Sequence, residues 1–273
     1  MTALLAILLA AQAAQPAPAP ETTFDPLPTA RGATVAEEAR LTVCRTTAAQ
    51  DAEAGIAAAN QWLSEGGGLL ARQCLGIAMA AGGRFDAALA TFDAAAREAQ
   101  QSGSLRRAFI EAQLGNTALA AGYPARARTA LSSALALGTL PPVEQGLAHA
   151  DRARAQVALG DAAAARADLD AATRLAPQDG GVWLLSATLA RRMRDFARAQ
   201  NDIQQAAALS PTDPAVALEA GNIAWMVDRP DAARRSWQSA IAIAPASAAA
   251  QAARAQLREL EAEAASPPPP PAP

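Results

Sequence analysis

The chain has 273 residues and a formal net charge of −3. This balance excludes proteins that bind nucleic acids through a general basic field, because such a field must neutralise many phosphates. All 23 basic residues are Arg and none is Lys, which excludes enzymes that depend on a P-loop Lys, a Schiff-base Lys or a Lys general base.

The first residues have the pattern of an export signal. Residues 4–10 form an apolar run that is too short for a bilayer span of about 20 residues, and Ala11-Gln12-Ala13 has the small-x-small pattern of a cleavage site. We therefore predict a signal peptide at residues 1–13 and a periplasmic or otherwise exported protein with no stable membrane span after processing. Because no Lys or Arg precedes the apolar run, an uncleaved Ala-rich start on a cytoplasmic protein stays open as the alternative.

Residues 14–33 contain five prolines, each of which removes an amide donor. This composition predicts an extended Pro/Ala-rich tether and no folded element. A degenerate helical repeat is expected at 34–68, with helices over residues 34–50 and 51–64.

A repeat domain is expected at residues 69–247. The repeat period is marked by three prolines spaced by 34 residues, Pro177, Pro211 and Pro245. A period near 34 is typical of stacked helix–turn–helix units. Small residues share one column, which contains Ala153, Ala187 and Gly221. Large residues share another, which contains Leu169, Ile203 and Trp237. The same arrangement recurs upstream with slightly longer spacing, at Gly76 and Phe92 and at Gly115 and Leu131.

This pattern resembles the tetratricopeptide repeat, whose consensus runs W-x2-L-G-x2-Y, then A-x3-F, then P. Ala199-x3-Ile203 and Ala233-x3-Trp237 match the A-x3-F segment, Trp183 matches the Trp, and Gly221 matches the Gly. The Tyr of the consensus has no counterpart. The resemblance implies an all-α solenoid of about five to six stacked units.

A terminal helix is expected at residues 248–265, after the N-cap residue Ser247. Its apolar stripe of Ala250, Ala253, Leu257 and Leu260 would cover the last hydrophobic face of the stack. The Pro-rich tail at 266–273 cannot continue a helix, and we expect it to be disordered.

Catalytic and metal sites are not expected. The one histidine, His149, is accompanied by no nucleophile motif, and one His with two distant Cys cannot supply a usual zinc ligand set. Asp168 and Asp170 are interpreted as solvated charges on an amphipathic helix. We therefore expect no enzyme activity and no cofactor.

Cys44 and Cys74 are the two cysteines of the chain. They lie on the expected first helices of two successive units, which pack side by side. If the chain is exported, a disulfide between them is permitted. The alternative is a pair of buried thiols that act as small hydrophobic groups.

Stacked repeats expose a concave face lined by the first helix of each unit. The resemblance implies that the residues just after the small column point into this groove, namely Ile77, Asn116, Arg154, Thr188 and Asn222. One turn later come Leu119, Val157, Arg191 and Trp225. From these we take Asn116, Arg154, Arg191, Asn222 and Trp225 as candidate partner-binding residues.

The function predicted from the sequence is a monomeric, non-enzymatic scaffold of the bacterial cell envelope. It would bind a protein or peptide, and no nucleic acid, in the concave groove. Two alternatives remain: a self-assembling spacer without a groove ligand, and an accessory subunit of an envelope enzyme.

Overall fold

The computed structural model describes residues 33–265, which form thirteen α-helices and no β-strand. The helices are α1 (Val35–Gln50), α2 (Ala52–Ser64), α3 (Gly68–Ala81), α4 (Phe85–Gln101), α5 (Arg107–Ala120), α6 (Pro124–Ala136), α7 (Pro142–Ala158), α8 (Ala162–Leu175), α9 (Gly180–Arg192), α10 (Phe196–Leu209), α11 (Pro214–Met226), α12 (Pro230–Ile243) and α13 (Ala248–Ala265). The expected signal peptide at 1–13, the tether at 14–33 apart from Ala33, and the tail at 266–273 lie outside the described residues.

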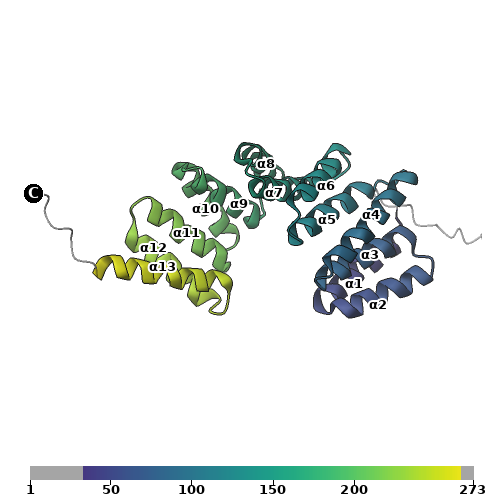
Figure 1. Ribbon diagram of the computed structural model, residues 1–273, viewed down its shortest axis with the longest axis horizontal. Coiled ribbons are helices and arrows are strands. Elements are labelled where there is room, and N and C mark those ends of the chain that lie inside the picture. The colour runs from purple at the N-terminus through teal and green to yellow at the C-terminus, as the bar shows by residue number, and fades with distance from the viewer. Residues whose placement is uncertain (1–32, 266–273) are drawn as a thin grey trace, which may run out of the picture.

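The first twelve helices form six antiparallel pairs that stack side by side (Figure 1). Each helix packs against its neighbours in the chain, and each odd-numbered helix also contacts the next odd-numbered one. Figure 1 shows the stack curving into an open arch, with α1 and α2 at one end and α13 at the other. α13 packs against α11 and α12 and so covers the last pair. The predicted all-α solenoid with a C-terminal capping helix is confirmed.

Five of the six pairs, from α3/α4 to α11/α12, are closed by a small residue that faces a large one. The large residue lies sixteen positions after the small one, and the pairs are Gly76 with Phe92, Gly115 with Leu131, Ala153 with Leu169, Ala187 with Ile203, and Gly221 with Trp237. A Cβ atom built on Gly221 would lie 2.4 Å from the Trp237 ring, so the ring fills the space that a side chain would need. The columns read from the sequence are therefore the contacts that close the helix pairs.

Short polar residues and prolines set the helix ends. Asp161 and Asp195 begin α8 and α10 by accepting backbone hydrogen bonds of 3.0 and 3.1 Å from Ala164 and Arg198. The spaced prolines, Pro177, Pro211 and Pro245, each lie two residues beyond the end of a helix. In the turn before α10, Arg194 has a φ of 63°, a backbone conformation that glycine adopts more easily.

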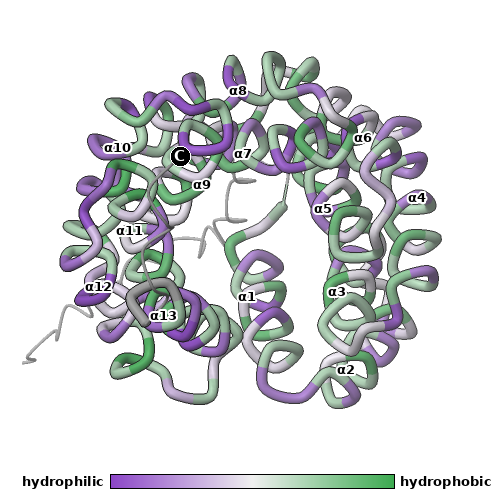
Figure 2. Tube along the Cα trace, turned by 60° about the vertical axis from the view of Figure 1, so that its left-hand side comes forward, coloured by the Kyte–Doolittle hydropathy of each residue, from purple (hydrophilic) through white to green (hydrophobic). Residues whose placement is uncertain are grey.

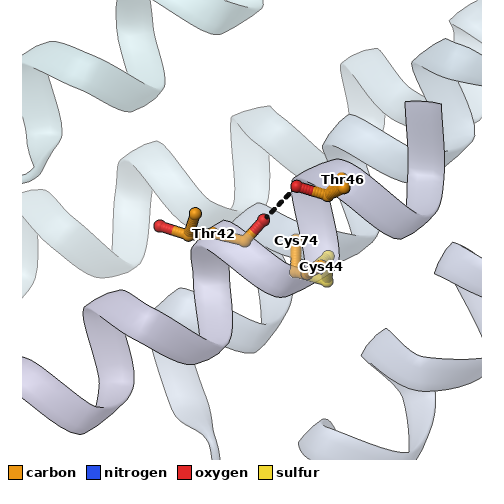
Figure 3. Close-up of a disulfide and its surroundings, with 4 residues drawn as sticks. All are labelled: Thr42, Cys44, Thr46 and Cys74. Atoms are coloured by element: carbon orange, nitrogen blue, oxygen red, sulfur yellow. Dashed lines mark hydrogen bonds between the residues drawn. A yellow bond between two sulfur atoms is a disulfide. The ribbon is translucent and has the colours of Figure 1, made fainter.

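The first pair, α1/α2, is held in another way. The position sixteen before Trp62 is Thr46, which is exposed and donates its hydroxyl to the Thr42 carbonyl of its own helix (Figure 3). The small–large contact at sixteen-residue spacing is therefore missing from this pair. Instead, Cys44 on α1 and Cys74 on α3 are joined as a disulfide, with Cα atoms 6.0 Å apart (Figure 3).

A buried arginine adds a second tie to α1. Arg106 precedes α5 and its side chain is 2% exposed. Its Nη1 donates to Oε1 of Gln73 on α3 at 2.8 Å, and its Nη2 pairs with Glu38 on α1. One guanidinium thus connects three odd-numbered helices, and it compensates part of the cost of its own burial through these partners.

Asp168 corrects the sequence interpretation, because its side chain is buried and not solvated. It accepts two hydrogen bonds from Arg152, at 2.8 and 2.7 Å, and lies 2.7 Å from Nδ1 of His149. Burial acts to raise the pKa of Asp168, but the bonds from Arg152 and His149 outweigh it and hold the pKa at about 2. The repeat places a second buried aspartate, Asp202, 34 residues later, where it accepts a hydrogen bond from Ser186.

The Gly221–Trp237 contact can be tested by a double-mutant cycle. Gly221→Ala is expected to destabilise the protein by about 1–3 kcal/mol, because the added methyl group meets the ring. Combining it with Trp237→Leu should cost less than the sum of the two single changes, since an alanine–leucine pair fits at Ala153 and Leu169. Thermal unfolding followed by circular dichroism measures all four proteins. Strictly additive losses would contradict the contact.

Removing the Cys44–Cys74 cross-link should destabilise the amino-terminal end of the arch and leave the rest unchanged. The cross-link joins residues 30 apart, and closing a loop of that length contributes about 3–4 kcal/mol on the chain-entropy model. In the Cys44→Ala/Cys74→Ala variant, hydrogen exchange of residues 35–64 should become faster, while exchange in α9–α12 stays the same. Equal exchange of residues 35–64 in both proteins would overturn this expectation.

The Asp168 carboxylate should make stability depend on acidity. Its folded pKa lies below the ordinary value of 3.8, so its contribution is complete above about pH 4 and is lost as the pH falls towards 2. Asp168→Asn is expected to cost about 2 kcal/mol at pH 7 and to flatten the urea-unfolding profile between pH 4 and pH 2. The control is Asp231→Asn, since the Asp231 side chain is 79% exposed and should change stability little. Equal effects of the two variants would count against the buried cluster.

Candidate functional site: the concave face

The inner side of the arch is the candidate site. Figure 2 shows the odd-numbered helices α3, α5, α7, α9 and α11 on the inside of the curve and their even-numbered partners outside. This arrangement follows from the stacking, because each odd-numbered helix also contacts the next odd-numbered helix. Within the described part of the chain, cavities open between these inner helices.

The amino-terminal groove is a cavity of about 610 Å³ between α1, α3, α5 and α7. Val143 and Leu147, one turn apart on α7, line it and are 53% and 39% exposed. Part of its polar lining is paired internally, since Gln73 donates to Gln113 at 2.8 Å and also accepts from Arg106. The groove therefore offers uncovered apolar side chains beside polar groups several of which already have partners.

Two smaller cavities follow along the same face. The middle pocket, of about 170 Å³, lies between α7 and α9 with α8 at its base, and its polar lining consists of Arg154, Thr188 and Arg192. The carboxy-terminal pocket, of about 230 Å³, lies where α9, α11 and α13 meet, and Gln256 of α13 forms part of its wall.

The structure places Asn116 and Arg154 on either side of one carboxylate. Asn116 donates to Oδ2 of Asp151 at 2.9 Å, and Arg154 pairs with Oδ1 of the same residue at 3.0 Å. Asn116 lines the amino-terminal groove and Arg154 lines the middle pocket. Asp151 therefore forms the boundary between two neighbouring cavities.

Arg191, Asn222 and Trp225 form a second group and line the carboxy-terminal pocket together. Arg191 binds the buried Glu219 through two hydrogen bonds, of 2.6 and 3.1 Å. Asn222 donates to Glu219 at 3.3 Å and accepts from the Trp237 indole at 3.1 Å. These polar groups are thus engaged in holding α9, α11 and α12 together.

Trp225 is partly buried against the last core cluster. Its ring centroid lies 6.2 Å from that of Trp237, and the two rings are tilted by 47°. The other residues expected in the groove also line the three cavities, with the exception of Leu119, which packs against the core. The five candidate residues therefore divide between two places on one face and do not form a single site.

Arg192 lines the middle pocket but is not one of the five candidates. The sequence places it in a run of basic residues, with Arg191, Arg194 and Arg198, that could hold an acidic segment or be solvated helix surface. It lies one turn after Thr188 and two turns after Leu185, so helical spacing puts all three on one side of α9. The groove column of the repeat passes over it because Arg191, the adjacent residue, occupies that column.

Among residues 33–265, no group of three His, Cys, Asp or Glu side chains could hold a metal ion. His149 is hydrogen-bonded to Asp168, which also accepts hydrogen bonds from Arg152. None of the described helices combines the length and the hydropathy needed to cross a bilayer.

Comparisons with known proteins define the fold. No protein-family model and no curated protein matches the sequence. The Cut9–Hcn1 hetero-tetramer of the anaphase-promoting complex aligns with a TM-score of 0.66 at 17% identity, over 80% of this chain and 42% of that one. This chain thus spans less than half the length of that match.

Two further structures are matched over nearly their whole length. Pseudomonas aeruginosa PilF aligns with a TM-score of 0.66 at 16% identity, over 81% of this chain and 97% of PilF. YrrB, described as a tetratricopeptide-repeat protein with an unusual peptide-binding site, aligns with a TM-score of 0.52 at 16% identity, over 69% of this chain and 91% of YrrB. The described part of the chain has the tetratricopeptide-repeat fold.

Proposed function

We propose that this protein is a non-enzymatic interaction scaffold that holds a segment of another protein on its concave face. The observation that carries the proposal is the amino-terminal groove, where Val143 and Leu147 are exposed and no described segment covers them. Exposed apolar side chains gathered in a hollow are typical of interaction sites. The peptide-binding site named for YrrB and the assembly named for Cut9–Hcn1 are in keeping with this use of the fold.

We further propose that the scaffold works outside the cytoplasm, in the cell envelope. The support is the Cys44–Cys74 cross-link together with the signal-like pattern of residues 1–13. Structural disulfides form and persist in oxidising compartments and are rare in the cytosol.

The groove can be tested by site-specific photo-crosslinking in cells. A photoreactive amino acid at position 147 should capture a partner, because Leu147 lines the groove and is 39% exposed. Val143→Asp should abolish that adduct, since a charge one turn away makes the apolar lining unfavourable for an apolar segment.

Leu159 is the matched control. It lies at the end of the same helix, is also 39% exposed and lines none of the three cavities. The same reagent at position 159 should give no adduct that depends on Val143. Identical adducts from both positions, or an adduct at 147 that survives Val143→Asp, would refute binding in the groove.

A further inference from the structure

The middle pocket differs from its neighbours in its chemistry. Most of its lining is apolar, with Leu169 of α8 at the base and Leu185 and Leu189 of α9 on one wall. Its polar residues are Arg154, Thr188 and Arg192, and no carboxylate lines it. It is therefore an apolar hollow with a positively charged rim.

The size of the pocket limits what it can hold. Its volume is about 170 Å³, and an apolar cavity of about 150 Å³ holds a benzene ring. One aliphatic side chain fits this space, whereas a helix does not. A water molecule against the apolar walls would find few hydrogen-bond partners. Replacing it with the side chain of Leu, Ile or Val is therefore favourable.

The charge of the rim is only partly neutralised by the residues that the structure describes. Arg192 is exposed and pairs with none of the residues that the structure describes. Arg154 pairs with Asp151, but that carboxylate is shared with Asn116. A guanidinium carries five N–H donors, so Arg154 keeps donors for a second acceptor. The neighbouring Arg191 is different, because Glu219 already binds it through two hydrogen bonds.

We propose that the middle pocket takes one aliphatic side chain of a partner segment and that an adjacent Asp or Glu of that segment binds Arg154 and Arg192. The aliphatic group packs on Leu169, Leu185 and Leu189, and the carboxylate lies at the rim, where charge-assisted hydrogen bonds are available. This proposal rests on the proposed function, because it names the chemistry of the segment that the concave face holds.

The carboxylate belongs to a side chain within the segment and not to a chain end. The middle pocket lies between two further hollows on the same face, the amino-terminal groove and the carboxy-terminal pocket. Asp151 lies at the boundary between the amino-terminal groove and the middle pocket. It accepts a hydrogen bond from Asn116, which lines the groove, and pairs with Arg154, which lines the pocket. A segment that runs through the middle pocket can use all three hollows, whereas one that ends in it can use at most two.

The test is selection from a displayed library of random 12-residue peptides with Gly/Ser flanks on both sides, so that no peptide has a free carboxyl end. The full-length protein should enrich peptides with Asp or Glu within two positions of Leu, Ile or Val. Against Arg192→Gln the acidic preference should disappear, and a synthetic copy of an enriched peptide should bind about fivefold more weakly. Arg258→Gln, an exposed arginine on α13 outside the pocket, is the charge-matched control and should change neither result.

The outcomes separate this proposal from the proposed function. Enriched peptides that lack the acidic–aliphatic pair, or that bind Arg192→Gln unchanged, overturn the pocket proposal. If those peptides bind the Leu147→Asp variant more weakly than the unchanged protein, binding in the amino-terminal groove is supported and only the pocket proposal fails. A parallel library contains peptides with free carboxyl ends. If only that library gives binders, the claim that the carboxylate belongs to a side chain within the segment is wrong. The absence of any enriched peptide from both libraries counts against both proposals.

Discussion

The fold depends on one repeated contact, in which a large side chain of the second helix of a pair fills the space left by a small residue of the first. Where the large residue is Phe or Trp the small one is Gly, and where it is Ile the small one is Ala. Leu is paired once with Gly, at Gly115 and Leu131, and once with Ala, at Ala153 and Leu169. Small residues on the first helix thus let the helices of an alanine-rich chain approach closely. Because the contact recurs at a fixed spacing, the pairs repeat one packing arrangement along the stack.

The concave face is a consequence of this regularity. The inner helices carry the small members of the contacts, and their remaining faces line the hollow of the arch (Figure 2). Polar groups on this face have two roles. Arg191, Asn222 and Glu219 hold neighbouring helices together, whereas Arg192 has no partner among the described residues. Chemical type alone does not distinguish a residue that stabilises the stack from one that is available to a ligand.

The sequence was sufficient for the fold because its signals are periodic. Prolines, small residues and large residues recur in phase, and a column repeated five times is informative even where each residue alone is ambiguous. Asp168 could not be placed in this way. It precedes Leu169 of the large column, and whether such a position meets solvent or the paired helix depends on the pair geometry. Its burial is understood only when Arg152 and His149 are seen beside it.

Contacts between residues that lie far apart in the chain could not be predicted from the sequence either. Arg106 lies in the turn between α4 and α5, and its partner Glu38 is 68 residues away. The candidate groove residues were partly recognised because the repeat assigns them to one column. The column does not show which of their hydrogen-bond donors are already bonded to other residues of the protein.

The tie between Arg106 and α1 has a consequence for how the molecule assembles during synthesis. A polypeptide is made from its amino end, so α1 emerges before Gln73, Cys74 and Arg106, which fasten it. Each of the pairs from α3/α4 to α11/α12 contains its own closing contact between neighbouring helices. By contrast, α1 has its full set of partners only after the chain has been made as far as the start of α5, so this end of the arch is completed by segments that are synthesised later.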